Sequence, residues 1–198
     1  MTYIEFKETP LYAGLPYGEL TESDEMMLFK YAQGKVLEIG TFLGRSTAIM
    51  SAKADWVDTF DLFEYIMSIV EEKNRMHYEE LFRKYPHSFS EVREFLSRYP
   101  NVGVHLRTEK SLKRIATASQ PFDLVFLDAD HSEKGVESDF NEVIPFVKRK
   151  GVVLFHDSFQ RDTDSSQEVY KFLERMPSYI IKIDQTPATG SITVWEKE

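Results

Sequence analysis

Short apolar runs alternate with amphipathic stretches along most of the chain. This alternation predicts a parallel sheet whose strands are joined by crossover helices. Several runs are almost continuously apolar, which indicates strands covered by helices on both faces. The predicted strands are Lys35–Ile39, Trp56–Asp61, Val102–Leu106, Phe122–Leu127, Val152–His156, Tyr179–Asp184 and Ser191–Glu196.

Helical spacing between the strands is clearest toward the C-terminus. Two apolar stripes follow the i, i+3, i+4, i+7 pattern: Phe140, Val143, Ile144 and Val147, then Val169, Phe172, Leu173 and Met176. We expect the first helix to end at Gly151. The second should begin with a capping box formed by Ser165 and Glu168, and end at Pro177.

The last two strands are separated only by residues 185–190, too few for a crossover helix, so we expect them to be antiparallel. The predicted fold is an α/β, Rossmann-like, doubly wound sheet of seven strands. It is mostly parallel, with an antiparallel C-terminal hairpin and helices on both faces.

We assign residues 1–198 to a single domain that begins with an N-terminal helical segment, residues 1–34. Residues 63–100 contain no predicted strand and form a helical insertion, with helices at Phe63–Lys84 and Phe89–Ser97. Ser88 and Glu91 form a capping box for the second helix. Long connections in compact domains are usually functional, so we expect the insertion to form a lid over a site at the carboxyl edge of the sheet or a dimer contact.

Composition narrows the partners and the compartment. The formal net charge of −9 argues against nucleic-acid binding, and the basic run Lys148-Arg149-Lys150 is interpreted as the solvated end of a helix. The absence of cysteine excludes disulfides, thiolate catalysis and zinc–sulfur sites. We see no signal peptide and no apolar run of about 18 residues. The expectation is a cytoplasmic protein with no membrane partner.

The stretch from Val36 to Thr47 carries the strongest functional signal. An apolar strand ends at Glu38-Ile39, Gly40 permits a tight turn, and Gly44 lets a helix begin close to the strand. The next strand ends in Asp61, a carboxylate able to accept both hydroxyl protons of a ribose. The structural alternatives are a sharp turn without a ligand, and a helix-capping carboxylate at Asp61.

The same stretch separates two classes of cofactor. A dinucleotide site normally reads G-x-G-x-x-G, but Phe42 occupies the place of the middle glycine. Glu38 would add negative charge beside any phosphate. Both features count against NAD and favour a cofactor with a cationic amino-acid end.

A second polar group follows two neighbouring strands, and the carboxyl ends of those strands should bring it into one pocket. Its members are Asp128, Asp130, His131, His156 and Asp157. Burying such a cluster is costly unless a metal, a substrate or proton transfer uses it. The alternatives are that His131 caps the next helix or pairs with Asp130, and that His156 is a packed imidazole at a strand end.

The stretch from Val36 to Thr47 resembles the nucleotide-binding motif of S-adenosylmethionine-dependent methyltransferases, and the likeness extends from Lys35 to the C-terminus. The most similar branch contains catechol, caffeoyl-coenzyme A and macrocin-type O-methyltransferases, with related bacterial methyltransferases. The resemblance implies S-adenosyl-L-methionine as cofactor and a small hydroxylated molecule as methyl acceptor. It assigns cofactor binding to Glu38, Gly40, Thr41, Phe42, Gly44, Ser46, Asp61, Glu109, Lys110, Ser111 and Asp128.

Within that assignment, Glu38 and Gly40 face the methionine amino end and Ser46 its carboxylate. Asp61 holds the ribose, and residues 109–111 border the adenine. In metal-dependent members, carboxylates matching Asp128 and Asp157 bind a divalent cation, so the resemblance implies a Mg²⁺ or Mn²⁺ site.

The chain departs from this pattern in two places. Ser158 stands where catechol-type members have Asn, and His156 stands where sugar-type members have a carboxylate. In the alternative without a metal, His131 or His156 takes the acceptor's proton while carboxylates such as Asp128 orient the imidazole. N-methylation without a metal and a catalytically silent cofactor-binding protein stay open as functions. A homodimer is a further expectation.

Overall fold

The computed structural model describes residues 1–70, 72–108, 111–118, 121–158, 164–176, 181–182 and 191–198. Six strands of four residues or more form one sheet, and the two-residue strand β6 extends its edge. The strands are β1 (Lys35–Ile39), β2 (Trp56–Asp61), β3 (Val102–Leu106), β4 (Phe122–Leu127), β5 (Val147–Phe155), β6 (Ile181–Lys182) and β7 (Thr193–Glu196).

The strand order is β3-β2-β1-β4-β5-β7-β6, with β1 near the middle of the sheet. β1 to β5 pair in parallel, whereas β7 runs antiparallel to both β5 and β6. The order reverses direction at β1, between β2 and β4, which is where open α/β sheets bind ligands. The predicted Rossmann-like, mostly parallel sheet with an antiparallel C-terminal pair is confirmed.

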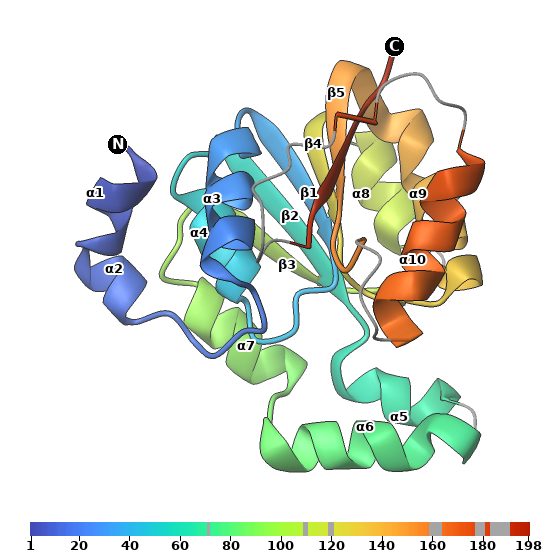
Figure 1. Cartoon of the computed structure of the whole chain (residues 1–198). Coiled ribbons are helices and arrows are strands. Elements are labelled where there is room, and N and C mark those ends of the chain that lie inside the picture. The colour runs from blue at the N-terminus through green and yellow to red at the C-terminus, as the bar shows by residue number, and fades with distance from the viewer. Residues whose placement is uncertain (71, 109–110, 119–120, 159–163, 177–180, 183–190) are drawn as a thin grey trace.

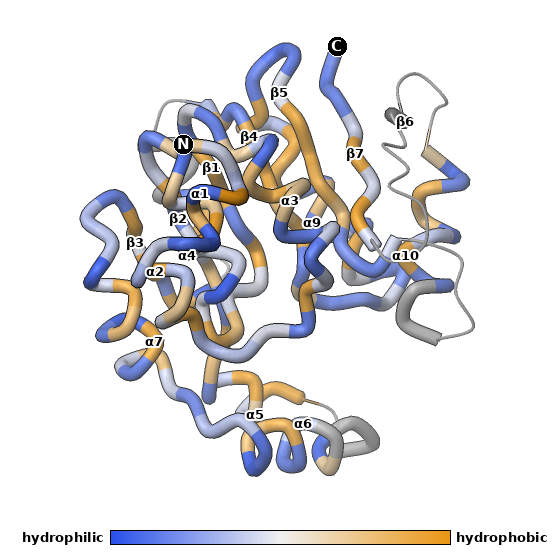
Figure 2. Tube along the Cα trace, turned by 60° about the vertical axis from the view of Figure 1, so that its left-hand side comes forward, coloured by the Kyte–Doolittle hydropathy of each residue, from blue (hydrophilic) through white to orange (hydrophobic). Residues whose placement is uncertain are grey.

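Helices lie on both sides of this sheet (Figure 1). They are α1 (Tyr3–Lys7), α2 (Pro10–Ala13), α3 (Glu22–Tyr31), α4 (Arg45–Ser51), α5 (Ile66–Ile69), α6 (Glu72–Lys84), α7 (Phe89–Leu96), α8 (Ser111–Ala118), α9 (Glu133–Val143) and α10 (Asp164–Arg175). Short 3₁₀ helices are η1 (Phe63–Tyr65) and η2 (Ile144–Phe146). One core cluster joins the sheet to α8, α9 and α10, and another joins it to α1, α3 and α4. Figure 2 shows the hydrophobic residues of the strands running through the interior between these layers.

β5 begins earlier than predicted, and the basic run at residues 148–150 lies in it rather than at a helix end. The preceding helix α9 ends at Val143 because Pro145 has no amide hydrogen to continue the α-helical pattern. The expectation that this helix continues to Gly151 is therefore wrong. Lys148 Nζ lies 2.7 Å from Asp123 Oδ1, where the pairing of β4 with β5 shifts register.

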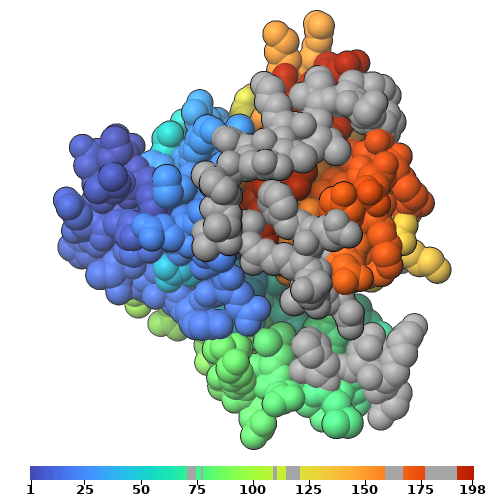
Figure 3. Space-filling model, viewed as in Figure 1, coloured from blue at the N-terminus to red at the C-terminus, as the bar shows by residue number. Residues whose placement is uncertain are grey.

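The insertion also differs from the expectation. The single predicted helix over Phe63–Lys84 is divided into η1, α5 and α6, with Val70 in an extended conformation after α5. α7 begins after the Ser88 cap as predicted, and its Val92 and Leu96 are buried in a third core cluster. In Figure 3 this region forms a lobe at the bottom of the molecule. α7 therefore belongs to the core, whereas α5 and α6 project from it (Figure 1).

At the C-terminal side, α10 begins at Asp164, so Ser165 lies in its first turn and not at the cap before it. Pro177, and the predicted strand residues 179–180 and 183–184, fall outside the described residues. No helix in the described ranges is both long enough and apolar enough to pass through a bilayer.

Candidate functional site

The turn after β1 brings the predicted cofactor motif against the end of β4. Gly40 has a φ of 101°, and a Cβ there would lie 2.0 Å from the carbonyl oxygen of Asp128. The amide of Asp128 in turn donates to the carbonyl of Ile39 at 2.9 Å. Only glycine accommodates both the positive φ and this close approach. Two motifs that are 88 positions apart in the sequence thus meet at the carboxyl edge of the sheet.

Asp61, the last residue of β2, holds the loop of the cofactor motif in place. Its Oδ2 accepts hydrogen bonds from the amides of Thr41 and Phe42, both at 2.8 Å, and its Oδ1 accepts from the amide of Phe63 at 2.9 Å. Phe42 has a φ of 47°, which is uncommon for a residue other than glycine. Asp61 therefore caps this loop. A carboxylate has about four lone-pair positions, and these three amides do not occupy all of them. Ribose binding by Asp61 stays a prediction.

The side chain of Glu38 is fully buried beneath the same loop. Its Oε2 accepts hydrogen bonds from the hydroxyls of Thr47 and Thr59, the latter at 2.6 Å, whereas Oε1 has no hydrogen-bond partner within the described residues. Burial raises the pKa of Glu38 to about 7, although nearby hydroxyls, including that of Ser46, lower it. An unsatisfied buried oxygen is unusual in a native protein and suits a ligand that donates to it.

Four side chains at the ends of β4 and β5 form one ionisable cluster. Asp128 Oδ1 lies 2.9 Å from Nδ1 of His156 and 3.2 Å from Nε2 of His131. The other ring nitrogen of His131, Nδ1, lies 3.1 Å from Asp157 Oδ2. Asp157 Oδ1 is also 3.6 Å from His156 Nδ1. The structure therefore brings Asp128, His131, His156 and Asp157 together.

Asp130 lies outside this cluster of ion pairs. Its Oδ1 accepts the amide of Ser132 at 2.9 Å, and Ser132 is the residue that caps α9. Both structural alternatives for His131, a helix cap and a pair with Asp130, are therefore wrong.

The charges in the cluster shift one another's pKa. Burial opposes protonation of His131, but Asp128 and Asp157 outweigh it and raise the pKa of His131 to about 9. In the same way, Asp128 and Asp24 raise the pKa of His156 against strong burial. Burial alone would raise the pKa of Asp128, yet the two histidines lower it below its ordinary range. The two carboxylates thus favour the protonated form of His131 at neutral pH.

A carboxylate that the sequence analysis missed lies on the far side of His156. Asp24 of α3 is fully buried, and its Oδ2 is 3.9 Å from His156 Nε2. Asp24 Oδ2 accepts from the amide and hydroxyl of Thr21, at 2.9 and 2.7 Å, and its Oδ1 accepts from the amide of Ser191 at 2.6 Å. The spacing of Thr21 and Asp24 signals a helix start. Nothing in the sequence pattern signals that this helix meets His156.

Ser158 faces away from the cluster. Its hydroxyl donates to the carbonyl of Ser191 at 2.8 Å and lies 2.7 Å from the hydroxyl of Thr193. Ser158 thus connects β7 to the end of β5, and its hydroxyl is engaged there rather than at the ionisable cluster. Asp157, the residue before it, has a φ of 48°.

The remaining predicted cofactor residues are distributed as follows. Ser46 is buried in the first turn of α4, beside Glu38. Ser111 begins α8, and its amide and hydroxyl bond to Thr108. Glu109 and Lys110 fall outside the described residues. The structure thus places the predicted methionine and ribose residues together, and of the predicted adenine residues it describes Ser111 alone.

The N-terminal segment is anchored beside the cofactor motif by a buried ion pair. Glu25 Oε1 accepts from Arg45 Nε at 2.7 Å, and Arg45 directly follows Gly44. Glu25 Oε2 accepts from the hydroxyls of Tyr3 and Tyr12, at 2.6 and 2.8 Å. These residues were not predicted, because their pairing links elements that no local pattern connects.

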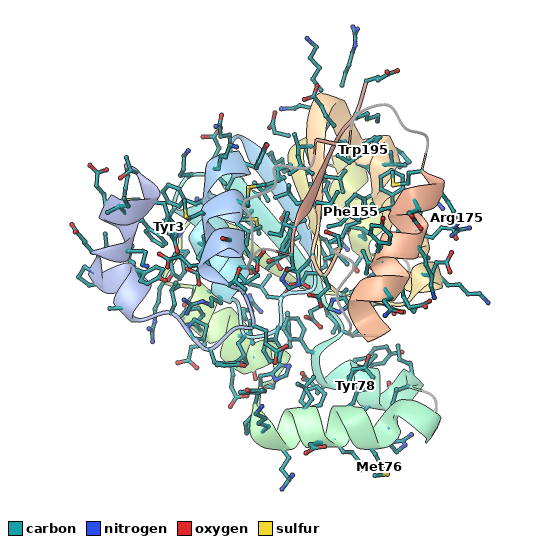
Figure 4. All side chains as sticks on the ribbon, viewed as in Figure 1. Tyr3, Met76, Tyr78, Phe155, Arg175 and Trp195 are labelled. Atoms are coloured by element: carbon teal, nitrogen blue, oxygen red, sulfur yellow. The ribbon has the colours of Figure 1, made fainter. Side chains whose placement is uncertain are left out.

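The insertion contacts the cofactor loop through aromatic rings. The Phe42 ring lies 5.8 Å from that of Tyr85 and 5.1 Å from that of His87, between ring centroids. Tyr85 also stacks on Tyr17 at 4.4 Å. On α6, Tyr78 points toward the sheet and Met76 points away from it (Figure 4). Burial raises the pKa of Tyr78, and the charges of Asp130 and Asp61 add to this effect. Tyr78 therefore faces the carboxyl edge of the sheet.

Comparison with known proteins agrees with this geometry. A family model described as a methyltransferase domain matches residues 37–158. An O-methyltransferase from Bacillus cereus in complex with S-adenosylhomocysteine (SAH) has a similar structure, with a TM-score of 0.58 and 17% identity, covering 94% of this chain and 86% of that one. The O-methyltransferase TomG of Streptomyces achromogenes, involved in tomaymycin synthesis and in complex with S-adenosylmethionine (SAM), is also similar. Its TM-score is 0.61 and its sequence identity 16%, covering 98% of this chain and 95% of that one.

A third similar structure is an rRNA methylase from Streptococcus thermophilus, with a TM-score of 0.54 and 11% identity, covering 92% of this chain and 98% of that one. No curated protein sequence matches the chain. At these identities the structural likeness establishes the fold alone.

Proposed function

The chain belongs to the methyltransferase domain family, and from that premise we propose that it transfers the methyl group of S-adenosylmethionine to the oxygen of a small hydroxylated acceptor. The observation that carries the proposal is the meeting of the Gly40 turn with Asp128 at one point of the sheet edge. This contact sets a cofactor motif directly beside an ionisable cluster.

The choice of cofactor is supported by the surroundings of Glu38. Its unpartnered Oε1 suits the ammonium group of a methionine-like end and would repel a pyrophosphate. The bulky Phe42, where a dinucleotide motif has glycine, points the same way. Two structurally similar O-methyltransferases hold SAH or SAM. When bound, S-adenosylmethionine supplies a methyl group on a sulfonium, a leaving group that needs no protonation.

The protein's own contribution is to position the acceptor oxygen and to stabilise its negative charge. His131 and His156 converge on Asp128, and His131 provides positive charge beside the edge where the cofactor motif lies. With a pKa of about 9, His131 is a donor and not a proton acceptor at neutral pH. These facts support charge stabilisation by the cluster more than general-base catalysis by a free imidazole.

The magnesium-like site implied by the resemblance fits these residues poorly. Asp128 Oδ1 lies beside two imidazole nitrogens, Ser158 is engaged with β7, and Asp157 faces His131. Magnesium prefers carboxylate, carbonyl and water oxygens over imidazole. We therefore assign no step to magnesium.

Two measurements test the proposal. Calorimetry should give a dissociation constant for SAH in the micromolar range, which corresponds to a binding free energy of about −8 kcal/mol. Binding of NAD should be weaker or undetectable. Incubation with methyl-labelled S-adenosylmethionine and panels of phenols, sugars and amines should then transfer label to a hydroxyl. Tighter binding of NAD than of SAH would overturn the cofactor assignment, and label on amines alone would overturn O-methylation.

A further inference from the structure

Asp128, His131 and His156 point one potential metal ligand each at a common position. Their ligand atoms all lie within 4.8 Å of one another, the one such group found in the part of the chain that the structure describes. The two shortest separations are 2.9 and 3.2 Å, both from Asp128 Oδ1 to ring nitrogens. Ligands of one d-block cation at about 2.0–2.2 Å are separated by comparable distances. A small shift of the side chains would bring all three atoms onto a single ion.

His156 is the least satisfied member of this group. Its side chain is only 7% exposed, yet neither ring nitrogen makes an aligned hydrogen bond to a described residue. The nearby carboxylates of Asp128 and Asp24 lie at ion-pair distance but outside hydrogen-bond geometry. A buried imidazole with unused nitrogens is costly, and a bound cation would use one of them.

Each histidine also has a carboxylate behind it. His131 turns Nε2 toward Asp128 and Nδ1 toward Asp157, at 3.1 Å. His156 turns Nδ1 toward Asp128 and Nε2 toward Asp24, at 3.9 Å. Histidines that ligate metals almost always present their second nitrogen to a carboxylate, carbonyl or water, which fixes the ring and raises its basicity. The same arrangement occurs twice here, with Asp157 and Asp24 as the outer carboxylates.

We propose that Asp128, His131 and His156 bind one divalent cation of the iron-to-zinc part of the d block, with Asp157 and Asp24 as outer carboxylates that orient the two histidines. The inference deepens the proposed methyltransferase function and rests on it. It replaces the carboxylate pair Asp128 and Asp157, which the sequence favoured, by a site of two imidazoles and one carboxylate. Such a donor set suits iron, cobalt, nickel or zinc, whereas magnesium requires oxygen ligands.

The cation would supply a Lewis acid for the acceptor oxygen at the edge of the cofactor site. In this proposal Asp24 of helix α3 orients His156, and so connects the N-terminal helix to the metal site.

Cobalt is the probe, because Co²⁺ bound to imidazole and carboxylate has visible absorption bands. The full-length protein, freed of metal by chelation and dialysis, is titrated with Co²⁺ and followed by absorbance, with Mg²⁺ and Zn²⁺ as competitors. We expect one Co²⁺ per chain, displaced by an equal concentration of Zn²⁺ and unaffected by a hundredfold excess of Mg²⁺.

Variants locate the site. His131→Asn carries the test, since that side chain is partly exposed and its loss should spare the fold, and it should abolish the cobalt bands. His156→Asn should do the same, with circular dichroism to confirm folding. Asp24→Asn should weaken Co²⁺ binding by about 10- to 100-fold, as for other outer carboxylates. The matched control is His105→Asn, because His105 Nε2 lies 2.9 Å from Asp58 Oδ1 on β2 and β3, in no cluster with Asp128.

The inference is overturned if His131→Asn binds Co²⁺ like the wild type, or if Mg²⁺ displaces Co²⁺ at equal concentration. It is also overturned if Asp157→Asn abolishes binding while His131→Asn does not, which would restore the carboxylate pair. SAH calorimetry on the same samples separates the two proposals. Binding of SAH without Co²⁺ binding refutes the metal site alone, whereas failure to bind SAH refutes the proposed function.

Discussion

The carboxylate of Asp61 accepts the backbone amide of Phe42 at 2.8 Å, at a position where Phe42 adopts a left-handed conformation. The same oxygen accepts the amide of Thr41. A residue predicted to bind a ribose therefore also builds the loop that would surround the rest of the cofactor. Loss of Asp61 should affect both roles, and the two effects can be measured separately.

Asp61→Ala should weaken SAH binding by about 1.5–3 kcal/mol, the scale of a hydrogen bond to a charged group. It should also lower the free energy of unfolding, because the amides of Thr41 and Phe42 lose their acceptor. Calorimetry and urea denaturation measure the two effects. Asp55→Ala is the control, since Asp55 is exposed before the start of β2. A variant that loses stability but binds SAH like the wild type would show that Asp61 only caps the loop.

The bounds of β1, β2 and β4 were predictable because each is a run rich in apolar residues that is closed by a glycine or an acidic residue, Gly40, Asp61 and Asp128. The start of β5 was not, because residues 148–150 are all basic, and the pairing of Lys148 with Asp123 of β4 is a contact between strands that no local pattern signals. The pattern of neighbouring residues thus predicts a strand when the strand's own residues are apolar. It fails where a contact from another strand compensates for unfavourable composition.

The candidate site shows the same division. Asp128, His131, His156 and Asp157 were predicted, because strand ends in a parallel sheet share one edge. Asp24 and Glu25 were not, because they contact the site only through the packing of α3 across the sheet. Their position in the first turn of a capped helix explains an acidic residue there without any function. The sequence consequently offered no reason to connect them with His156 or Arg45.

Glu25→Ala should strongly destabilise the protein. The carboxylate is 2% exposed and accepts hydrogen bonds from Arg45 and two tyrosine hydroxyls. Removing one partner of a buried ion pair costs about 3–5 kcal/mol, because the remaining charge is left without compensation. Urea denaturation of the variant measures this loss. Glu22→Ala is the control, since Glu22 pairs with Lys7 at the surface and should cost less than about 1 kcal/mol. Equal effects of the two substitutions would contradict the assigned role of Glu25.

The insertion should be separable from cofactor binding, but only in part. Val92 and Leu96 of α7 lie in the core, so a deletion must end before Ser88. Replacing residues 66–84 by a Gly/Ser linker should leave SAH binding measurable by calorimetry. It should abolish turnover with an acceptor found in the screen, or abolish dimerisation seen by light scattering. If turnover and oligomeric state are both unchanged by the deletion, α5 and α6 are solvent-exposed helices that contribute neither to the acceptor site nor to a dimer contact.

One residue of α6 carries a sharper form of this prediction. Tyr78 faces the carboxyl edge of the sheet, where Asp61 and Asp130 raise its pKa, whereas Met76 is 80% exposed on the opposite side of the helix. If the insertion covers the acceptor, Tyr78→Leu should raise the KM for the acceptor and leave SAH affinity unchanged. Met76→Ala should alter neither. Identical kinetics for the two variants would place the acceptor elsewhere.

Glu38 predicts how stability depends on pH. Burial raises the pKa of Glu38 from 4.5 to about 7 in the folded protein, so the folded state binds this proton more tightly than the unfolded state. The stability contributed by the protonated carboxyl is therefore fully present below pH 4.5 and is lost as the pH rises through about 7. A shift of this size corresponds to about 3 kcal/mol.

Glu38→Gln should remove that dependence, because the amide accepts hydrogen bonds from Thr47 and Thr59 without titrating. The free energy of unfolding, from urea denaturation at pH 5.5 and pH 8, should fall more for the wild type than for the variant, with Glu94→Gln as an exposed control. Added SAH should reverse the difference at pH 8, since its ammonium group would pair with ionised Glu38 and favour the wild type. Parallel pH curves for wild type and Glu38→Gln would mean that Glu38 is already ionised in the empty site, with a charged partner other than the cofactor.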